Sequence, residues 1–377
     1  MIDTKIFYDH LIKHQMDLFV GVPDSLLKPF CGYIEDHCDR SRRITTANEG
    51  NAIAIASGYH LSANKYGVVY MQNSGIGNAV NPLLSLADEE VYSIPMLLII
   101  GWRGEPGTKD EPQHIKQGKT TISLLEAMGI EYRILDSSYK IQIEHCHKYM
   151  KENNKPIALI VKKDTFSEYK EEKKTNGYFL TRERSLEVVL DKLHSDEYVV
   201  STTGKTSREI FEIRERKGQG HANDFLTVGS MGHTASIAYG LSIGTDKNVY
   251  CIDGDGSFLM HMGGLAVIAY NCKSNFKYIM INNGAHESVG GQSTVAFSID
   301  VEKILSGMGF KNIYIAKTED DIIHGMELLA NEELNALIIY TKQGSRDNLG
   351  RPVTTPVKNK NDLMKQIKQE KYESDNL

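Results

Sequence analysis

The sequence predicts an α/β protein built from two doubly wound parallel-sheet domains. Its 377 residues exceed the size of one ordinary domain. Short apolar runs that end in Gly, Asn or Ser alternate with helix-like stretches, which is typical of parallel βα units. A charged segment poor in aliphatic residues, 164–179, separates two series of such runs and is typical of an exposed linker. We therefore expect domains at residues 1–170 and 180–377, with the boundary near 170–180.

Each expected strand is a short apolar run, and several are apolar throughout, as suits strands buried on both faces of a parallel sheet. The first series consists of residues 16–22, 44–47, 67–75, 94–102 and 156–163. The second series consists of residues 197–204, 248–256, 276–284, 312–316 and 335–342. Apolar side chains at helical spacing predict a helix over 185–193. The polar tail, 361–377, predicts a terminal helix that frays.

The composition excludes several classes of protein. Apolar residues make up 41% and charged residues 24%, as in soluble globular proteins, and no apolar run is long enough to cross a bilayer. The N-terminus has no apolar signal segment, and the five cysteines are scattered without a CxxC pair, so we expect reduced thiols in a cytoplasmic protein. A net charge of −6 argues against a nucleic-acid partner. We expect no membrane partner either.

One acidic residue, Asp255, lies between Gly254 and Gly256 directly after an apolar strand. A tight turn with an Asp that caps the next helix would explain it. However, Asn282 and Asn283 end the next expected strand, with 25 residues between Gly256 and Asn282. Successive strand ends in a parallel sheet are neighbours, so the carboxylate and a carboxamide oxygen should converge where such sheets bind ligands. Oxygen ligands suit Mg²⁺ with a phosphate-bearing cofactor, and the pair predicts a metal–diphosphate site.

The "GDGS" stretch followed by "NN" resembles the signature of thiamine diphosphate enzymes. The resemblance implies that Asp255, Asn283 and the main-chain carbonyl of Ala285 hold the Mg²⁺ that binds the cofactor diphosphate; Asn282 satisfies the same spacing. It also implies that residues 1–170 form a pyrimidine-binding domain and residues 180–377 a diphosphate-binding domain.

A thiamine enzyme also needs a glutamate that hydrogen-bonds the aminopyrimidine ring of the cofactor. Glu49, in "TTANEGNAIAIASGYHL", lies between an expected strand and an apolar helix that would shield it from water and favour a shared proton. A first-turn glutamate favoured by the helix dipole, with Asn48 or Asn51 as the cap, is the ordinary alternative. With the metal motif in the other domain, we favour the catalytic role.

Further cofactor contacts follow from the same resemblance. Met231, in "VGSMGHTASIAYG", matches the large apolar residue that lies under the cofactor in this family; an ordinary core methionine is the alternative. The "QNSGIGN" segment resembles the glycine loop of the pyrimidine domain and fails as a dinucleotide fingerprint, because the third glycine is missing. The remaining implied contacts are Asn73, Gly204, Gly229, Ser230, Gly254, Gly256 and Ser257.

The chain has no room for the middle domain that many thiamine enzymes contain. It resembles the compact phosphonopyruvate and sulfopyruvate decarboxylases almost from end to end, in "GVPDSLL", "ANEGNA", "QNSGIGN", "GEPGTKDEPQH" and "NNGAHESVGGQ". The resemblance implies decarboxylation of a small anionic 2-oxo acid. Sulfopyruvate enzymes commonly have two separate subunits, so this fused chain favours phosphonopyruvate, and with it phosphonate biosynthesis, including that of 2-aminoethylphosphonate.

The distal anion of such a substrate requires cationic or main-chain donors. The candidates are Ser25, Arg103, Lys109 and Lys116, with Lys205 and Arg208 in the second domain. Each of these charges alone is more typical of a solvated surface. His114 and His286 are candidates for proton transfer late in the reaction, and "HESVGG" is alternatively a mobile lid hinged at its glycines.

In the resembling family the two halves of a site come from different subunits, so we expect at least a homodimer with the active site at the subunit interface. Two alternatives stay open. A thiamine-dependent carboligase of the acetolactate synthase type would use the same motifs. A non-catalytic nucleotide-binding module could contain a DG loop and an NN turn but would not respond to the cofactor.

Overall fold

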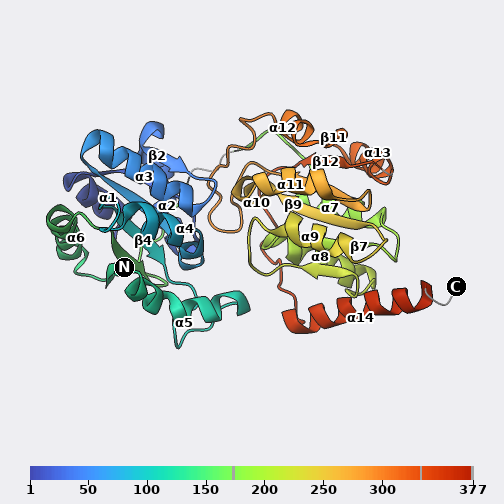
Figure 1. Cartoon of the computed structure of the whole chain (residues 1–377), viewed down its shortest axis with the longest axis horizontal. Coiled ribbons are helices and arrows are strands. Elements are labelled where there is room, and N and C mark those ends of the chain that lie inside the picture. The colour runs from blue at the N-terminus through green and yellow to red at the C-terminus, as the bar shows by residue number, and fades with distance from the viewer. Residues whose placement is uncertain (172–174, 332, 375–377) are drawn as a thin grey trace. The chain divides into compact units, whose positions relative to one another are not determined.

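The computed structural model describes residues 1–171, 175–331 and 333–374 (Figure 1). The chain divides into two compact units, one of Met1–Lys173 with Ser288–Gln292 and one of Lys174–Glu287 with Ser293–Leu377. Each unit contains a six-stranded parallel sheet flanked by helices, which confirms the predicted α/β class with two doubly wound domains. Part of the expected linker, residues 172–174, lies outside the described residues.

The sheet of the first unit has the strand order β2-β1-β3-β4-β6-β5, and every pairing is parallel. Its central strands are buried on both faces; in β4, for example, Leu97 and Ile99 pack on one side while Leu98 and Ile100 pack on the other. The strands are β1 (Met16–Gly21), β2 (Arg43–Thr45), β3 (Tyr66–Gln72), β4 (Leu97–Gly101), β5 (Glu131–Ile134) and β6 (Ile157–Val161).

Six helices cover this sheet, three on each face. On one face lie α1 (Thr4–Lys13), α2 (Lys28–His37) and α6 (Tyr139–Asn153), which contribute Phe7, Phe30 and Cys146 to one core cluster. On the other lie α3 (Glu49–Ala63), α4 (Ile76–Pro82) and α5 (Pro112–Ala127), which contribute Ala52, Ile76 and Leu125 to a second cluster. Because each strand is followed by a helix on one face or the other, the polar residues that follow strands gather at the carboxyl edge.

The sheet of the second unit has the strand order β11-β12-β10-β9-β7-β8 and is also parallel throughout. Its strands are β7 (Tyr198–Ser201), β8 (Asp224–Leu226), β9 (Val249–Gly254), β10 (Phe276–Asn282), β11 (Asn312–Ala316) and β12 (Asn335–Tyr340). The strands β9 and β10 lie at the centre of the sheet, so the loops that follow them are neighbours.

Helices again cover both faces of this sheet. One face is covered by α7 (Arg182–Asp191), α8 (Lys205–Lys217) and α13 (Glu319–Leu329). The other is covered by α9 (Thr234–Ile243), α11 (Gly263–Asn271) and α12 (Val301–Met308). The short α10 (Asp255–Met260) follows β9 directly. The expected terminal helix, α14 (Pro356–Ser374), begins before residue 361 and buries Leu363 in the core.

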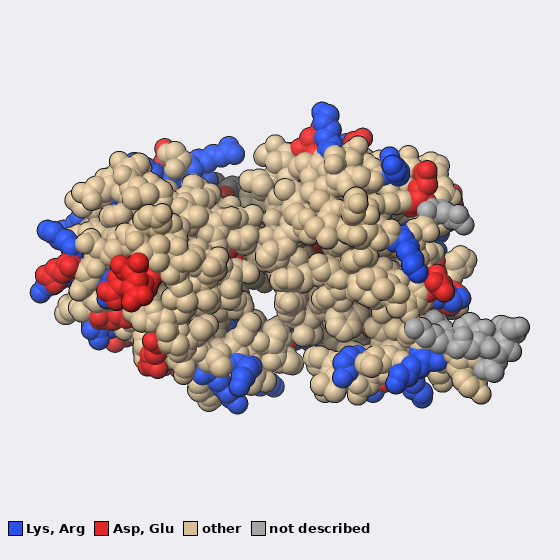
Figure 2. All heavy atoms as spheres, in the orientation of Figure 1, with Lys and Arg blue, Asp and Glu red and all other residues tan. Residues whose placement is uncertain are grey.

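The surface is mixed in charge. On the face drawn in Figure 2, basic side chains lie among acidic ones, and no broad basic stripe is visible among the residues described there. None of the helices in the described ranges is long and apolar enough to cross a membrane. All five cysteines are free thiols, and Cys31, Cys38, Cys146 and Cys251 are buried.

Candidate active site

Asp255 lies at the carboxyl edge of the second sheet, where β9 ends. The apolar run of β9 ends at Ile252 and is followed by Asp253 and Gly254. Gly254 pairs with Ile281 of β10, so the two strands end side by side. The Asp255 side chain is buried, and its Oδ2 accepts a hydrogen bond of 2.5 Å from Thr294 Oγ1. The edge location that the sequence predicts for this carboxylate is therefore present.

The environment of Asp255 is unfavourable to a bare negative charge. Burial raises the pKa of Asp255 to about 7, although hydrogen bonds from Thr294 and from main-chain amides, including that of Ala285, oppose the shift. An ionised carboxylate in such surroundings is stabilised by a bound cation. The donor set at this point is made of oxygen atoms, which fits Mg²⁺.

The two asparagines at the end of β10 are both buried but differ in their partners. Asn283 Nδ2 donates to Glu287 Oε2 at 2.7 Å, and Asn283 Oδ1 accepts from the Ala285 amide at 3.1 Å. Asn282 Oδ1 accepts from the Gly284 amide at 3.1 Å, while its buried Nδ2 has no partner among the described residues. A carboxamide oxygen has two lone pairs, so either oxygen retains one for a metal.

Asn283 is tied to a buried cluster of charges that the sequence reasoning missed. Glu287 pairs with Arg182 Nη1 at 2.9 Å and with Lys205 Nζ at 3.1 Å. Arg182 in turn makes a two-pronged pair with Glu209, at 2.7 and 2.8 Å. Burial would raise the pKa of Glu287, but the charges of Arg182 and Lys205 outweigh it and hold that pKa below its usual value. No sequence motif joins these residues, which come from α7, α8 and the loop after β10.

The segment before α9 packs against the Asp255 loop. Ser230 has a positive φ of 57°. Two residues further on, the Gly232 amide donates a hydrogen bond to Ser257 Oγ at 3.2 Å. A Cβ at Gly256 would lie 3.0 Å from the Met231 methyl group and 2.9 Å from the His286 ring. Met231, His286 and the Asp255 loop are therefore in contact, and only a glycine leaves room at Gly256.

Two further predicted residues lie near this edge. His286 is buried, and burial lowers its pKa to about 4, so its imidazole is neutral at pH 7. Gly204 caps α8 at the end of β7 with a φ of 94°. Because β7 pairs with β9, the Gly204 loop lies at the same edge as Asp255. Gly229 is in the loop between β8 and α9.

In the first unit, Glu49 opens α3 and is buried. The Asn48 side chain caps the helix by accepting a hydrogen bond from the Asn51 amide, and Asn48 was one of the two caps that the sequence offered. The Glu49 carboxyl group therefore contacts other partners. Glu49 Oε2 accepts from Asn78 Nδ2 at 2.7 Å, and a Cβ on Gly75 would come within 2.2 Å of Glu49 Oε1. Burial raises the pKa of Glu49, and the bond from Asn78 offsets this only in part. Burial thus favours the protonated form of this carboxyl group.

Arg103 follows β4 and is brought to Ser25, which follows β1. Arg103 Nη1 donates to Ser25 Oγ at 2.8 Å, and its Nε donates to Asp110 Oδ2 at 2.8 Å while Nη2 binds the other Asp110 oxygen. Three of its five N–H groups are used in this way, which leaves two for an anion. The Arg103–Asp110 pair is neutral as a whole, and Asp110 was missed by the sequence reasoning.

Asn73 is fully engaged inside the first unit. Its Nδ2 donates to the Arg103 carbonyl at 2.8 Å and to Thr121 Oγ1 at 2.9 Å, and its Oδ1 accepts from the Arg103 amide at 3.2 Å. These bonds fix the main chain that carries Arg103. Nearby, Gln72 donates to the fully buried Asp24 at 2.6 Å, another residue that no sequence signal indicated.

The remaining predicted residues of this unit lie on or before α5. His114 is buried, and burial together with the charge of Arg103 lowers its pKa to about 4. Its Nδ1 has no partner among the described residues. Lys109 and Lys116 are exposed. Of the four anion contacts predicted in the first domain, the structure therefore brings together only Ser25 and Arg103.

A separate group in the first unit could also hold a metal. His10 of α1, His14 directly after that helix and Glu144 of α6 have ligand atoms within 4.8 Å of one another. Glu144 is 55% exposed, and the group shares no residue with the cofactor motifs.

The chain matches both halves of a known family. Residues 4–124 match the model of the N-terminal TPP binding domain of thiamine pyrophosphate enzymes, and residues 202–338 match that of the C-terminal TPP binding domain. Together with the two parallel sheets and the polar residues at their carboxyl edges, these matches define a thiamine pyrophosphate (thiamine diphosphate) enzyme.

Curated relatives define the family more narrowly. A phosphonopyruvate decarboxylase of Streptomyces viridochromogenes is 32% identical over 89% of this chain and 87% of its own. A sulfopyruvate decarboxylase of Methanosarcina acetivorans is 28% identical over 90% of this chain and 91% of its own. A sulfopyruvate decarboxylase subunit beta of Methanococcus maripaludis is 30% identical over 50% of this chain and 98% of its own. The chain belongs to the phosphonopyruvate decarboxylase family and is a thiamine diphosphate-dependent decarboxylase.

Proposed function

We propose that the protein decarboxylates 3-phosphonopyruvate to phosphonoacetaldehyde and CO₂ with thiamine diphosphate and Mg²⁺. The observation that carries the substrate is the identity of 32% to a phosphonopyruvate decarboxylase over 89% of the chain. The half-buried Arg103–Ser25 pair, at the carboxyl edge of the first sheet, supports an anionic substrate. When bound, thiamine diphosphate supplies a nucleophilic carbon and an electron sink for the bond that breaks to CO₂.

Mg²⁺ would be held by Asp255 Oδ1 or Oδ2, Asn283 Oδ1 and the main-chain carbonyl of Ala285. Asn283 is favoured over Asn282 because its amide nitrogen already has a carboxylate partner, Glu287, so its oxygen is the group left for a cation. The loops that carry Gly204, Gly229, Ser230, Gly254 and Ser257 would surround the diphosphate, and Met231 would contact the cofactor rings from its place against Gly256.

Glu49 would exchange a proton with the aminopyrimidine ring. Its burial raises its pKa, which favours the protonated form over the ionised form. Asn78 holds the carboxyl group in one orientation. Asn73 would act on the cofactor or through the main chain of Arg103, to which it makes two hydrogen bonds.

His114 and His286 would take part in proton transfer to the product carbon. Burial keeps both imidazoles neutral at pH 7, so a histidine that donates a proton must first gain one. A bound phosphonate within a few ångströms would raise the pKa of such a histidine and favour that gain. The charge of Arg103, the residue proposed to bind the anion, contributes to the lowered pKa of His114.

Sulfopyruvate is the second candidate substrate, because a sulfopyruvate decarboxylase also aligns over nearly the whole chain. The fusion of both halves in one chain therefore no longer favours phosphonopyruvate, because this sulfopyruvate decarboxylase also contains both halves in one polypeptide. The test is aldehyde formation from phosphonopyruvate, sulfopyruvate and pyruvate, compared as kcat/KM. We expect the largest value for phosphonopyruvate. A larger value for sulfopyruvate would change the substrate alone, and formation of a condensation product without aldehyde would favour the carboligase.

The anion site is tested with Arg103→Met. Loss of a charge-assisted hydrogen bond should lower kcat/KM for phosphonopyruvate by roughly 10- to 100-fold, from about 1.5–3 kcal/mol. Turnover of pyruvate, which lacks the distal anion, should fall much less. Lys109→Met and Lys116→Met serve as matched controls, because both lysines are exposed. Equal losses for both substrates would contradict anion binding by Arg103.

We also infer a homodimer or larger homo-oligomer in which Glu49 of one subunit and Asp255 of another serve one cofactor. The support is the family resemblance together with the location of these residues in different units. Sedimentation that gave a fully active monomer would contradict this proposal. Five free thiols support a reducing compartment such as the cytoplasm.

A further inference from the structure

The buried charge cluster beside Asn283 fixes the orientation of the Asn283 carboxamide. A carboxylate only accepts hydrogen bonds, so the contact of 2.7 Å with Glu287 Oε2 requires the NH₂ group of Asn283 to face Glu287. The carboxamide oxygen then faces away from Glu287, toward the Ala285 amide. Because a metal binds a carboxamide through its oxygen, this orientation is the one that a cation needs.

Glu287 itself is held firmly. Its two oxygens are divided between Arg182 at 2.9 Å and Lys205 at 3.1 Å, and Arg182 is locked by both oxygens of Glu209. The side chains of Arg182, Glu209 and Glu287 are only 5%, 1% and 10% exposed. Two glutamates and two cations make the cluster neutral, and each member restrains the next.

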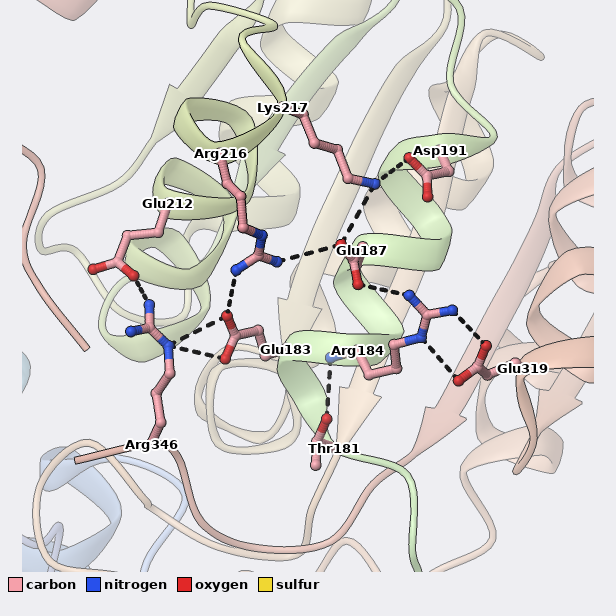
Figure 3. A network of polar contacts seen from close by, with 10 residues as sticks. All are labelled: Thr181, Glu183, Arg184, Glu187, Asp191, Glu212, Arg216, Lys217, Glu319 and Arg346. Carbon is pink, nitrogen blue, oxygen red and sulfur yellow. Dashed lines mark hydrogen bonds and ion pairs between the residues drawn. The ribbon is translucent and has the colours of Figure 1, made fainter. Parts of the chain in front are cut away.

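Such a cluster requires an explanation other than stability. Buried ion pairs often contribute little net stability, because removing charges from water costs several kcal/mol per ion. A contrasting network lies on the exposed side of α7, where Arg184 pairs with Glu187 and Glu319 and Arg346 pairs with Glu183 (Figure 3). Arg184 is 47% exposed, so its pairs avoid most of that cost. Only the buried cluster reaches the end of β10.

We propose that Glu287, held by Arg182 and Lys205, is a positioning residue that selects the orientation of the Asn283 carboxamide in which Oδ1 binds Mg²⁺. The inference rests on the proposed function, since it assumes that Asn283 is a metal ligand. Outer groups of this kind orient metal ligands and are worth roughly 10- to 100-fold in metal affinity.

The test is Glu287→Gln, which keeps the shape of the side chain but can donate as well as accept. Mg²⁺ affinity is measured by calorimetry with the full-length protein in saturating thiamine diphosphate, beside the melting temperature of the apoprotein. We expect Mg²⁺ affinity to fall roughly 10-fold or more. The control is Glu319→Gln in α13, which removes an exposed partner of Arg184. Arg184 lies on the same helix as Arg182, and this variant should leave Mg²⁺ affinity unchanged. Unchanged affinity in Glu287→Gln would overturn the inference.

A double-mutant cycle separates positioning from a general structural effect. If Glu287 acts through Asn283, Glu287→Gln should cause no further loss of Mg²⁺ affinity in an Asn283→Ala background. The same loss in both backgrounds would overturn the proposal. If Glu287→Gln does not fold, Lys205→Met removes one cation from the partly exposed side of the cluster and should lower Mg²⁺ affinity by a smaller factor; no loss would again overturn it.

The wild-type protein separates this inference from the proposed function. If it shows no Mg²⁺-dependent binding of thiamine diphosphate, the proposed function fails. If it binds both, and Asp255→Ala loses the binding while Glu287→Gln does not, only the positioning of Asn283 fails.

Discussion

The buried carboxyl groups of this protein differ in their hydrogen-bond and ion-pair partners. Glu49 and Asp255 accept hydrogen bonds from neutral side chains, Asn78 and Thr294, and burial raises the pKa of both. Glu287 is also buried, but Arg182 and Lys205 lower its pKa. The first two are therefore suited to exchange a proton or bind a cation, whereas Glu287 is suited to remain a fixed anion.

Replacing Glu49 by Gln tests the proton-exchange role. The amide keeps the size of the side chain and a partner for Asn78 but cannot accept a proton at neutral pH. We expect kcat to fall by roughly 10²- to 10⁴-fold while the affinity for thiamine diphosphate changes little. Steady-state kinetics and a cofactor titration check this. Loss of cofactor binding in step with turnover would indicate that Glu49 serves binding alone.

His114 gives the protein a pH-dependent stability that can be isolated. Its pKa is about 4 in the folded chain and 6.5 in the unfolded reference, with Arg103 and Asp110 as its charged neighbours. Between pH 6.5 and pH 4, His114 is protonated in the unfolded state but neutral in the folded state. Its contribution to the free energy of unfolding is therefore fully present above pH 6.5 and is lost as the pH falls toward 4. The loss is at most about 1.4 kcal/mol per pH unit.

The measurement compares the melting temperatures of wild type and His114→Gln from pH 7.5 to pH 4.5. Other groups titrate equally in both proteins, so the difference between them reports on His114. We expect the advantage of the wild type to shrink as the pH falls. A constant difference would show that His114 is not held neutral by burial.

At the scale of elements, the ten runs expected from the sequence became strands, and two strands were missed. The missed strands β5, "EYRI", and β8, "DFL", are short and lie at the sheet edges. An edge strand is covered on fewer sides, so it lacks the continuous apolar run that marked the central strands. The adjacency of the two strand ends that carry Asp255 and Asn283 was predictable from the sequence, because β9 and β10 pair directly.

The side chains that contact the predicted residues could not be predicted from the sequence. Asn78 contacts Glu49 from a different helix, and Asp110 reaches back to Arg103 across a turn. Arg182 meets Glu287 across 105 residues of chain. Such contacts depend on how helices lie on the sheet, and no spacing in one sequence encodes them. The motifs predicted the candidate site, whereas the groups that contact its residues could be identified only from the fold.

The start of α4 offers a matched pair of glycines. A Cβ at Gly75 would come within 2.2 Å of Glu49 Oε1, whereas nothing lies within 4 Å of a Cβ at Gly77. We expect Gly75→Ala to displace the Glu49 carboxyl group and lower kcat by at least about 10-fold. Gly77→Ala should keep activity and add up to about 1 kcal/mol of stability, as alanine favours a helix. Similar activities of the two variants would contradict a close approach of Glu49 to Gly75.

At the scale of the whole molecule, each unit contributes a different chemical half. The first sheet carries Glu49, Arg103 and His114 at or beyond its carboxyl edge, and the second carries Asp255 and Asn283. Neither half alone has both a proton-exchanging carboxyl group and an oxygen-donor metal site among the described candidates. Under the proposed function, activity requires a first unit and a second unit to supply residues to one cofactor, whether within one chain or between two.

Mixing two inactive variants distinguishes these arrangements. Glu49→Gln damages only the first unit, and Asp255→Ala damages only the second. In a homodimer whose sites form between subunits, a mixed dimer has one site with both substitutions and one with neither. Random mixing should then restore about a quarter of wild-type activity. In the control mixture, Glu49→Gln with Arg103→Met, both substitutions fall in the first unit, so every site has a damaged first unit and phosphonopyruvate turnover stays low. Restoration in neither mixture would mean that each chain builds its own site, because an unsubstituted first unit could then never meet an unsubstituted second unit.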